Sequence, residues 1–280
     1  MPVLIPHTIR EAVEMLDAHR SAHLMTGGTD LMVEVNFNHR RPDTVIALRK
    51  VAELNAWSID RAAGTVRIGA GVPYADMEHG ELAGVLPALA AAARTVGSPQ
   101  IRAAGTIGGN LGTCSPAGDS LPVLFALDAS VHLESAAGER VLPVREFMTG
   151  PKRNTRNEGE IISAVTLPIS DGYQGYSKVG VRNAMVISVA SACLAVQGGS
   201  LRLALGSVGP TIIRCTDTED WFNDLPSREI AAPGHGTVRD FAERAAAEAR
   251  PIDDHRSTAA YRRHAISVLA ARLLERSTAR

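Results

Sequence analysis

Residues 97–122 read GSPQIRAAGTIGGNLGTCSPAGDSLP, the densest run of glycine in the chain, and residues 26–31 read TGGTDL. In such loops, glycines let the backbone turn with positive φ and let N–H groups approach an anion without side-chain interference. Two loops of this kind could grip one pyrophosphate, whereas the simpler interpretation of each is a tight turn. Neither loop matches G-x-G-x-x-G or G-x-x-x-x-G-K-[ST], so no motif supports a Rossmann or P-loop site.

The composition is that of an ordinary globular chain. Its 280 residues exceed what one hydrophobic core usually serves, so we expect two or three packed units. Lys+Arg total 29 and Asp+Glu total 30, so the chain has no excess of positive charge to attract a phosphate backbone. A nucleic-acid partner is therefore not expected. No segment approaches the roughly 18 apolar residues of a membrane-spanning helix, and the N-terminus does not resemble a signal peptide. We therefore expect a cytoplasmic protein without a membrane span.

The sequence offers no catalytic or metal-binding constellation. The three cysteines, Cys114, Cys193 and Cys215, are scattered, so neither a disulfide framework nor a ligand set for zinc or an iron–sulfur cluster is encoded. G-x-S-x-G and H-E-x-x-H are absent. We therefore predict no catalytic side chain and no metal ligand on this chain. A protein that holds a phosphate-bearing ligand without an acid–base set leaves the chemistry to that ligand.

Periodicity predicts the elements around the two loops. Thr8–Glu11 form a capping box that opens a helix, and a second helix is expected to start near Asp30. One helix is expected over residues 82–95, with Pro87 tolerable only near its start. Strands are expected at 44–48, 65–72, 131–134, 141–144 and 161–167, and three more strands at 173–181, 187–196 and 201–208 precede two C-terminal helices.

Several motifs together resemble one known family. Residues 26–31 resemble the A-G-G-T-D-L loop of the FAD-binding (medium) subunits of molybdenum hydroxylases, and residues 97–111, continued by 115–122, resemble that family's signature almost position for position. The family includes the medium subunit of carbon monoxide dehydrogenase and the flavin domain of xanthine dehydrogenase. Further matches, which extend the likeness over the whole chain, are Gly159–Ile162, Tyr176–Lys178 with Arg182, and residues 251–263.

The resemblance implies an α+β fold. It consists of a PCMH-type (vanillyl-alcohol-oxidase-like) FAD-binding domain with two subdomains, residues 1–58 and 59–170, and a C-terminal α+β domain, residues 171–280, built on a three-stranded antiparallel sheet with helices.

The resemblance also implies the cofactor site. Backbone amides of residues 26–31 and 106–110 would hold the FAD pyrophosphate, and Asp119 would bind ribitol or ribose hydroxyls. Ile161 and Val96 would line the flavin pocket, and Lys178 would donate a hydrogen bond beside the cofactor. Simpler alternatives stay open: Asp119 as a helix cap, Lys178 as a solvated strand lysine and Ile161 as plain core. The implied cofactor-binding residues are Thr26, Gly27, Gly28, Thr29, Asp30, Leu31, Val96, Gly105, Thr106, Gly108, Gly109, Asn110, Ser115, Asp119, Ile161 and Lys178.

One departure from the family pattern concerns the flavin face. The position of Gly112 carries a bulky apolar residue against the isoalloxazine in xanthine dehydrogenases, and here there is no side chain. The resemblance therefore leaves open whether this flavin is more exposed or is covered by another residue.

The function that the resemblance implies is electron transfer within a larger enzyme. Electrons from hydroxylation at a molybdenum cofactor would pass through [2Fe–2S] clusters on a partner to FAD on this chain, and then to NAD+, a quinone or oxygen. The implied partners are a large molybdopterin subunit and a small iron–sulfur subunit, in a dimer of heterotrimers. Two alternatives are a free-standing FAD-dependent oxidoreductase with its own small substrate and a non-enzymatic flavin-binding module.

Overall fold

The structure, a computed structural model, describes residues 2–279 and divides into two compact units. Unit 1 comprises the residues up to 77 with 98–114 and 128–168, and unit 2 comprises 78–97, 115–127 and the residues from 169 on. Residues 97–122 contain two of the points where the chain passes from one unit to the other. The glycine-rich stretch therefore contributes to both units.

The first part of unit 1 combines a helix with a small parallel sheet. Helix α1 (Ile9–Ala18) begins at the predicted capping box: the Glu11 N–H donates to Thr8 Oγ1 at 3.1 Å, and the Glu11 carboxylate accepts from the His7 N–H at 2.7 Å. The sheet has the order β1 (Val3–Leu4), β3 (Val45–Ala47), β2 (His23–Met25). Helix α2 (Leu31–Asn36) follows β2 and has Asp30 at its N-cap, as expected from the sequence.

The second part of unit 1 is a five-stranded antiparallel sheet. Its order is β4 (Trp57–Asp60), β5 (Thr65–Gly69), β10 (Ile161–Pro168), β6 (Ser130–Ser135), β7 (Gly138–Pro143). The central strand β10 is buried over its first five residues, as the continuous apolar run predicts. The remaining elements of unit 1 are two 3-10 turns at Leu48–Lys50 and Ala52–Asn55, α3 (Tyr74–Met77), α6 (Pro99–Ala104), α7 (Ile107–Thr113), α9 (Val144–Phe147) and the hairpin β8 (Met148–Gly150)–β9 (Arg153–Asn154).

The single helix expected over residues 82–95 is wrong. The structure has two helices, α4 (Gly80–Val85) and α5 (Pro87–Arg94), with a break at Leu86 where φ is −123° and ψ is 63°. Proline has no N–H to donate and disfavours helical geometry in the residue before it. Pro87 therefore ends one helix and occupies the first turn of the next, where its missing donor costs nothing.

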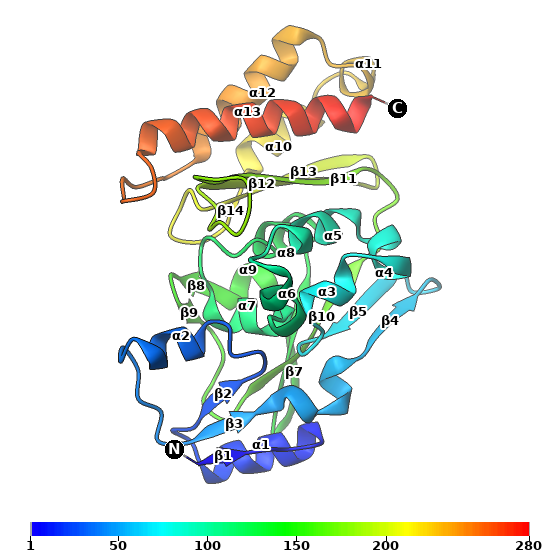
Figure 1. Ribbon diagram of the computed structural model, residues 1–280. Helices are drawn as coiled ribbons and strands as arrows, with labels where there is room; N and C mark the ends of the chain where they lie inside the picture. The colour runs from blue at the N-terminus through cyan, green and yellow to red at the C-terminus, as the bar shows by residue number, and fades with distance from the viewer. Residues whose placement is uncertain (1, 280) are drawn as a thin grey trace. The chain divides into compact units, whose positions relative to one another are not determined.

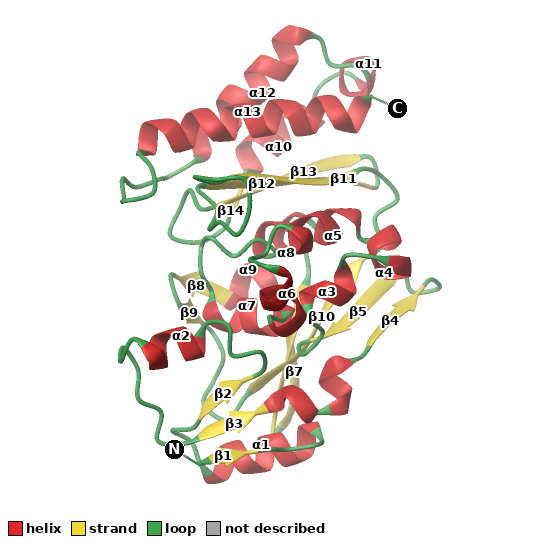
Figure 2. Cartoon of the chain, in the orientation of Figure 1, coloured by secondary structure: helices red, strands yellow, loops and turns green. Residues whose placement is uncertain are grey.

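Unit 2 is built around an antiparallel sheet with helices on both faces. The sheet order is β11 (Gln174–Val179), β12 (Ala190–Gln197), β13 (Ser200–Gly206), β14 (Ile213–Arg214). Helices α12 (His235–Glu248) and α13 (Ala259–Thr278) run side by side over one face, and α5 and α8 (Leu121–Ala126) pack on the other face (Figure 1). Helices α4, α10 (Thr216–Asn223) and α11 (Ser227–Ala231) complete the unit, and Figure 2 distinguishes its helices from the sheet.

Two details of this sheet differ from the expectation. A fourth strand, β14, pairs with β13 at only two positions, and so short a segment shows no periodicity in the sequence. Residues 187–189, expected in a strand, lie in the loop before β12. No helix among residues 2–279 is both long and apolar enough to cross a membrane.

Candidate cofactor site

The loop at residues 26–31 presents a row of unpaired donors. It follows β2 directly, and Gly28 has a φ of +70°, a conformation that favours glycine. Within residues 2–279, the backbone N–H groups of Gly27, Gly28, Thr29, Asp30 and Leu31 have no acceptor. Consecutive unpaired amides of this kind suit the oxygens of an anionic group such as a pyrophosphate.

The structure brings the two glycine motifs together in unit 1. A β-carbon at Gly27 would lie 1.8 Å from the Ala104 carbonyl oxygen, and one at Gly105 would lie 3.3 Å from Thr29 Oγ1. Thr113 Oγ1 also donates to Asp30 Oδ2 at 3.3 Å. Gly27 is therefore needed for the close approach of the two motifs, which lie far apart in the sequence.

The second glycine motif is a helix over most of its length rather than a loop. Thr106 caps α7 by accepting the Gly109 N–H at 3.0 Å on Oγ1, and its carbonyl accepts the Asn110 N–H at 3.0 Å. The Gly108 N–H donates to the Ala70 carbonyl at 3.0 Å. Three of the amides that the resemblance assigns to the pyrophosphate are thus engaged within the chain.

The glycines of α7 differ in what surrounds them. A β-carbon at the buried Gly108 would lie 2.5 Å from the Ala70 β-carbon, so this glycine serves the packing of α7 inside unit 1. Gly109 is exposed, and a β-carbon there would meet only Thr106 Oγ1, at 3.2 Å. At Gly112, also exposed, the nearest atom would be Ile162 Cδ1, at 3.8 Å. A β-carbon therefore fits at Gly112 without strain, whereas at Gly109 it requires Thr106 Oγ1 to move by a few tenths of an ångström.

A buried ion pair occupies unit 2. Lys178 Nζ, on β11, lies 2.7 Å from Asp119 Oδ2, and the exposed fractions of the two side chains are 8% and 9%. The ammonium also donates to the carbonyl oxygens of Thr95 at 2.8 Å and Val186 at 3.1 Å. The Tyr176 hydroxyl donates to Asp119 Oδ1 at 2.9 Å. All three protons of the Lys178 ammonium thus have acceptors in unit 2, and none is left over for the hydrogen bond to the cofactor that the resemblance implies.

This geometry overturns two of the simpler alternatives. Lys178 is not a solvated strand lysine, because its side chain is buried in the pair. Asp119 is not a helix cap, because α8 has Ser120 at its N-cap, with no side-chain cap hydrogen bond, and both Asp119 oxygens accept from β11.

Burial governs the electrostatics of the pair. Burial raises the pKa of the Asp119 carboxyl, while the charge and hydrogen bonds of Lys178 and the hydroxyl of Tyr176 lower it, and burial is the larger effect. The pKa of Tyr176 lies well above its ordinary value because the phenol is fully buried next to the Asp119 carboxylate. The phenol therefore stays protonated and donates to the carboxylate.

Tyr176 is the member of this cluster to which the sequence analysis assigned no role. Side chains two residues apart on a strand point to the same face of the sheet, so a functional Lys178 already placed Tyr176 beside it. This strand periodicity was the sequence signal that could have identified Tyr176 as a neighbour of Lys178.

The remaining predicted residues are divided between the two units. Ile161, the first residue of β10, lies in unit 1 with no exposed surface, as the core alternative expects. Val96 and Ser115 lie in unit 2, where Ser115 Oγ accepts the Ala117 N–H at 3.3 Å in the turn that leads to Asp119. The roles of these three residues toward a cofactor stay predictions.

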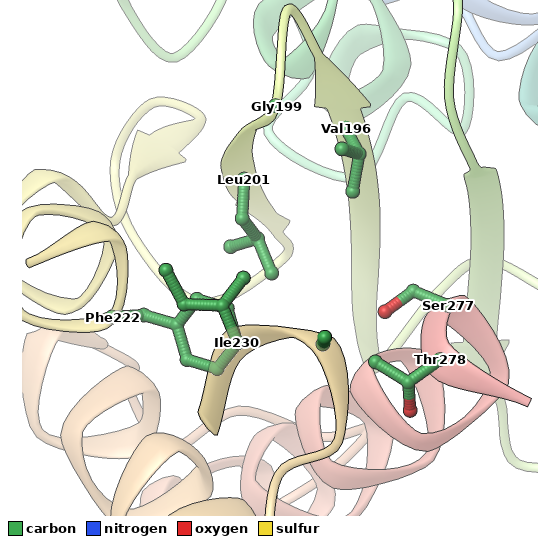
Figure 3. Close-up of a pocket in the computed structure, with 8 residues that line it drawn as sticks. Val196, Gly199, Leu201, Phe222, Ile230, Ser277 and Thr278 are labelled. Carbon is green, nitrogen blue, oxygen red and sulfur yellow. The ribbon is translucent and has the colours of Figure 1, made fainter. Parts of the chain in front are cut away.

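Other features of the chain do not resemble a reaction centre. Cys114, Cys193 and Cys215 are buried, and burial raises the pKa of the Cys114 thiol to about 11. Among residues 2–279, no group of three His, Cys, Asp or Glu side chains is arranged to hold a metal ion. A pocket of about 280 Å³ in unit 2 has a largely apolar lining that includes Val196 and Phe222 and none of the predicted cofactor residues (Figure 3).

Residues 1–170 match a protein family described as the FAD binding domain in molybdopterin dehydrogenase. The chain belongs to this family. Residues 176–277 match the C-terminal domain of CO dehydrogenase flavoproteins. The chain is therefore an FAD-binding oxidoreductase subunit, and the predicted α+β fold with an FAD-binding domain and a C-terminal domain is confirmed.

Relatives cover the chain almost end to end. The glyceraldehyde dehydrogenase medium chain of Sulfolobus acidocaldarius is 30% identical over 268 residues, 94% of this chain and 92% of that protein. The xanthine dehydrogenase FAD-binding subunit of Escherichia coli O157:H7 is 28% identical over 283 residues, 97% of this chain and 94% of that protein.

Solved structures agree on the fold. Carbon monoxide dehydrogenase from Hydrogenophaga pseudoflava matches with a TM-score of 0.89 and 26% identity, covering 99% of this chain and 96% of that chain. Quinoline 2-oxidoreductase from Pseudomonas putida 86 matches with a TM-score of 0.91 at 22% identity, over 99% of this chain and 96% of that chain.

Proposed function

We propose that this chain is the electron-transfer flavoprotein subunit of a molybdenum-containing hydroxylase. It takes electrons from [2Fe–2S] clusters on a small iron–sulfur subunit, which receives them from a large molybdopterin subunit, and passes them to NAD+, a quinone or oxygen. The observation that carries the proposal is the row of unpaired amides at residues 27–31 beside a second glycine motif, in a chain of the FAD-binding family.

The residues of the site fit FAD. The unpaired amides of Gly27 to Leu31 supply donors for the pyrophosphate oxygens, and the exposed Gly109 leaves the surface of α7 open to a close approach. Of the amides assigned at residues 106–110, those of Gly108, Gly109 and Asn110 donate within the chain. The amides of Thr106 and Ile107 are the ones left for the pyrophosphate. The Asp119 carboxylate keeps lone pairs for a ribitol or ribose hydroxyl while it accepts from Tyr176 and Lys178.

In this arrangement the protein binds and tunes, and the flavin, when bound, supplies the redox chemistry. The amides at residues 27–31 fix the pyrophosphate and so set the position of the rest of the cofactor. The Asp119–Lys178 pair places a cation and a carboxylate at fixed positions in unit 2. Hydrogen bonds from Lys178 to the carbonyls of Thr95 and Val186 hold the ammonium in place. Such preorganised charges need no reorganisation when an electron arrives or leaves.

The proposal includes the assembly and the boundaries expected from the sequence. The chain would associate as one medium subunit in a dimer of heterotrimers in the cytoplasm. Its FAD-binding domain would comprise subdomains 1–58 and 59–170, followed by the C-terminal domain 171–280.

The test is purification of the natively expressed, tagged chain, with the absorbance spectrum, metal content and co-purifying proteins determined together. Flavin absorbance with iron, molybdenum and two further subunits supports the proposal. Flavin on a lone chain that is bleached by a small substrate would favour the free-standing oxidoreductase instead. A flavin that accepts no electrons from any reductant would favour the binding module.

A further inference from the structure

Arg262 is a buried arginine on α13 that holds two separate backbone segments of unit 2. Only 4% of the residue is exposed, and fully buried arginines are rare unless paired. One guanidinium nitrogen, Nη1, donates to the carbonyl of Val189 at 2.8 Å and to that of Ser207 at 2.7 Å. The other, Nη2, donates to Asp254 Oδ1 at 2.7 Å. The planar fork of arginine suits this task, which a lysine ammonium cannot reproduce.

Each of the two held segments leads to one half of the buried ion pair. The Val189 N–H donates to the carbonyl of Val179 at 2.8 Å, and Val179 follows Lys178 on β11. The Ser207 N–H donates to the carbonyl of Pro116 at 2.8 Å, in the turn that leads to Asp119. Arg262 is thus linked through the backbone of Val189 to the strand of Lys178, and through the backbone of Ser207 to the segment of Asp119.

Stability alone does not account for a charged group at this position. Arg262 Nε, Ser188 Oγ and Ser207 Oγ are buried and have no hydrogen-bond partner within residues 2–279. Each unsatisfied buried polar group costs free energy, and apolar replacements of buried ion pairs are often neutral or stabilising. Ser207 also has a φ of +64°, a strained backbone conformation that the bond from Arg262 to its carbonyl helps to hold.

We propose that Arg262 is a positioning residue for the cofactor site: from α13 it fixes the backbone at Val189 and Ser207 and so sets the geometry of Lys178 and Asp119. This inference rests on the proposed function, in which Lys178 and Asp119 face FAD. It assigns to the C-terminal domain a role in tuning the flavin, exerted without any contact between Arg262 and the cofactor.

The experiment compares Arg262→Gln and Arg262→Lys with Arg263→Gln, the neighbouring exposed arginine, as the matched control. The chain is purified as the holoprotein, and FAD affinity, flavin reduction potential and thermal unfolding are measured for each variant. We expect both Arg262 variants to fold, to bind FAD more weakly on the order of tenfold and to shift the potential, while the control matches the wild type.

A double-mutant cycle separates positioning from a general loss of stability. Arg262→Gln is combined with Lys178→Gln, and a positioning role predicts that most of its effect on FAD affinity disappears in that background. Additive losses, or FAD affinity and potential unchanged in folded Arg262 variants, would overturn the inference. Failure of both Arg262 variants to fold would also overturn it, because Arg262 would then serve folding. A wild-type protein that binds no FAD would instead refute the proposed function.

Discussion

The Lys178 ammonium lies 2.7 Å from the Asp119 carboxylate in the interior of unit 2, and the two residues come from segments that the sequence separates widely. Lys178 also holds the carbonyls of Thr95 and Val186, so one side chain fixes the end of α5, the Asp119 segment and the loop before β12. The buried pair therefore connects three segments of unit 2 by hydrogen bonds.

Replacing Lys178 by Met is expected to destabilise the protein by about 3 to 5 kcal/mol, because the Asp119 carboxylate is left buried without its cation. Denaturant unfolding measures this loss. Lys152→Met is the control: Lys152 pairs with Glu34 at 2.5 Å but is 61% exposed, so its loss should cost no more than about 1 kcal/mol. Equal effects of the two substitutions would contradict the importance given to the buried pair.

Asp254 predicts a pH dependence of stability. Burial raises the pKa of its carboxyl, but the Arg256 and Ser257 N–H groups and the Arg262 guanidinium together lower it from 3.8 to about 2. A folded-state pKa below the unfolded value contributes stability that is present above about 4 and is lost as the pH falls toward 2. Asp254→Asn should therefore cost about 1 to 2 kcal/mol at neutral pH, allowing for solvent screening, and progressively less in acid.

Unfolding curves of Asp254→Asn and wild type at several pH values test this. A stability difference that stays constant down to pH 2, or that grows as the pH falls, would refute the assignment. The second outcome would mean that the folded-state pKa of Asp254 is raised.

Gly108 and Gly109 are adjacent but should respond differently to alanine. Gly108→Ala places a methyl 2.5 Å from the Ala70 β-carbon and is expected to cost about 1 to 3 kcal/mol through overpacking. A β-carbon at the exposed Gly109 would lie 3.2 Å from Thr106 Oγ1 and far from backbone, so Gly109→Ala should destabilise the protein less than Gly108→Ala. It should weaken FAD binding, since the methyl would stand where the pyrophosphate approaches α7. FAD titration and thermal unfolding of both variants measure this. Full FAD affinity in Gly109→Ala would remove α7 from the proposed site.

Gly112 tests the departure from the family pattern. A side chain fits there, because a β-carbon would meet only Ile162 Cδ1, at 3.8 Å. Gly112→Leu should therefore fold and should cover a flavin face that is more open in the wild type. We expect slower quenching of flavin fluorescence by iodide in the variant. Unchanged quenching would show that the flavin face lies away from residue 112.

Local signals predicted most of the individual elements, and non-local packing explains what they missed. The Thr8 capping box and the apolar run of β10 were confirmed because each is encoded within a few residues. The break at Leu86 was missed because the alanine-rich segment outweighed Pro87 in the prediction.

In the candidate site, too, the features encoded in short segments were predicted and the contacts between distant segments were not. The glycine motifs were evident, but the contact of Gly27 with Ala104 and the donation of Gly108 to Ala70 depend on pairings between distant segments. The partners of Lys178 were likewise invisible, since Thr95, Asp119 and Val186 reach it only through the packing of unit 2.

The central claim is that the unpaired amides at residues 27–31 and the neighbouring start of α7, both in unit 1, hold the pyrophosphate of FAD. The most direct test is release of the cofactor from the natively purified protein by acid precipitation, with chromatographic identification and quantification against protein. The account predicts FAD at one molecule per chain in the wild type and a markedly lower content in folded Gly109→Ala. FMN in place of FAD, or no flavin in the native protein, would contradict it.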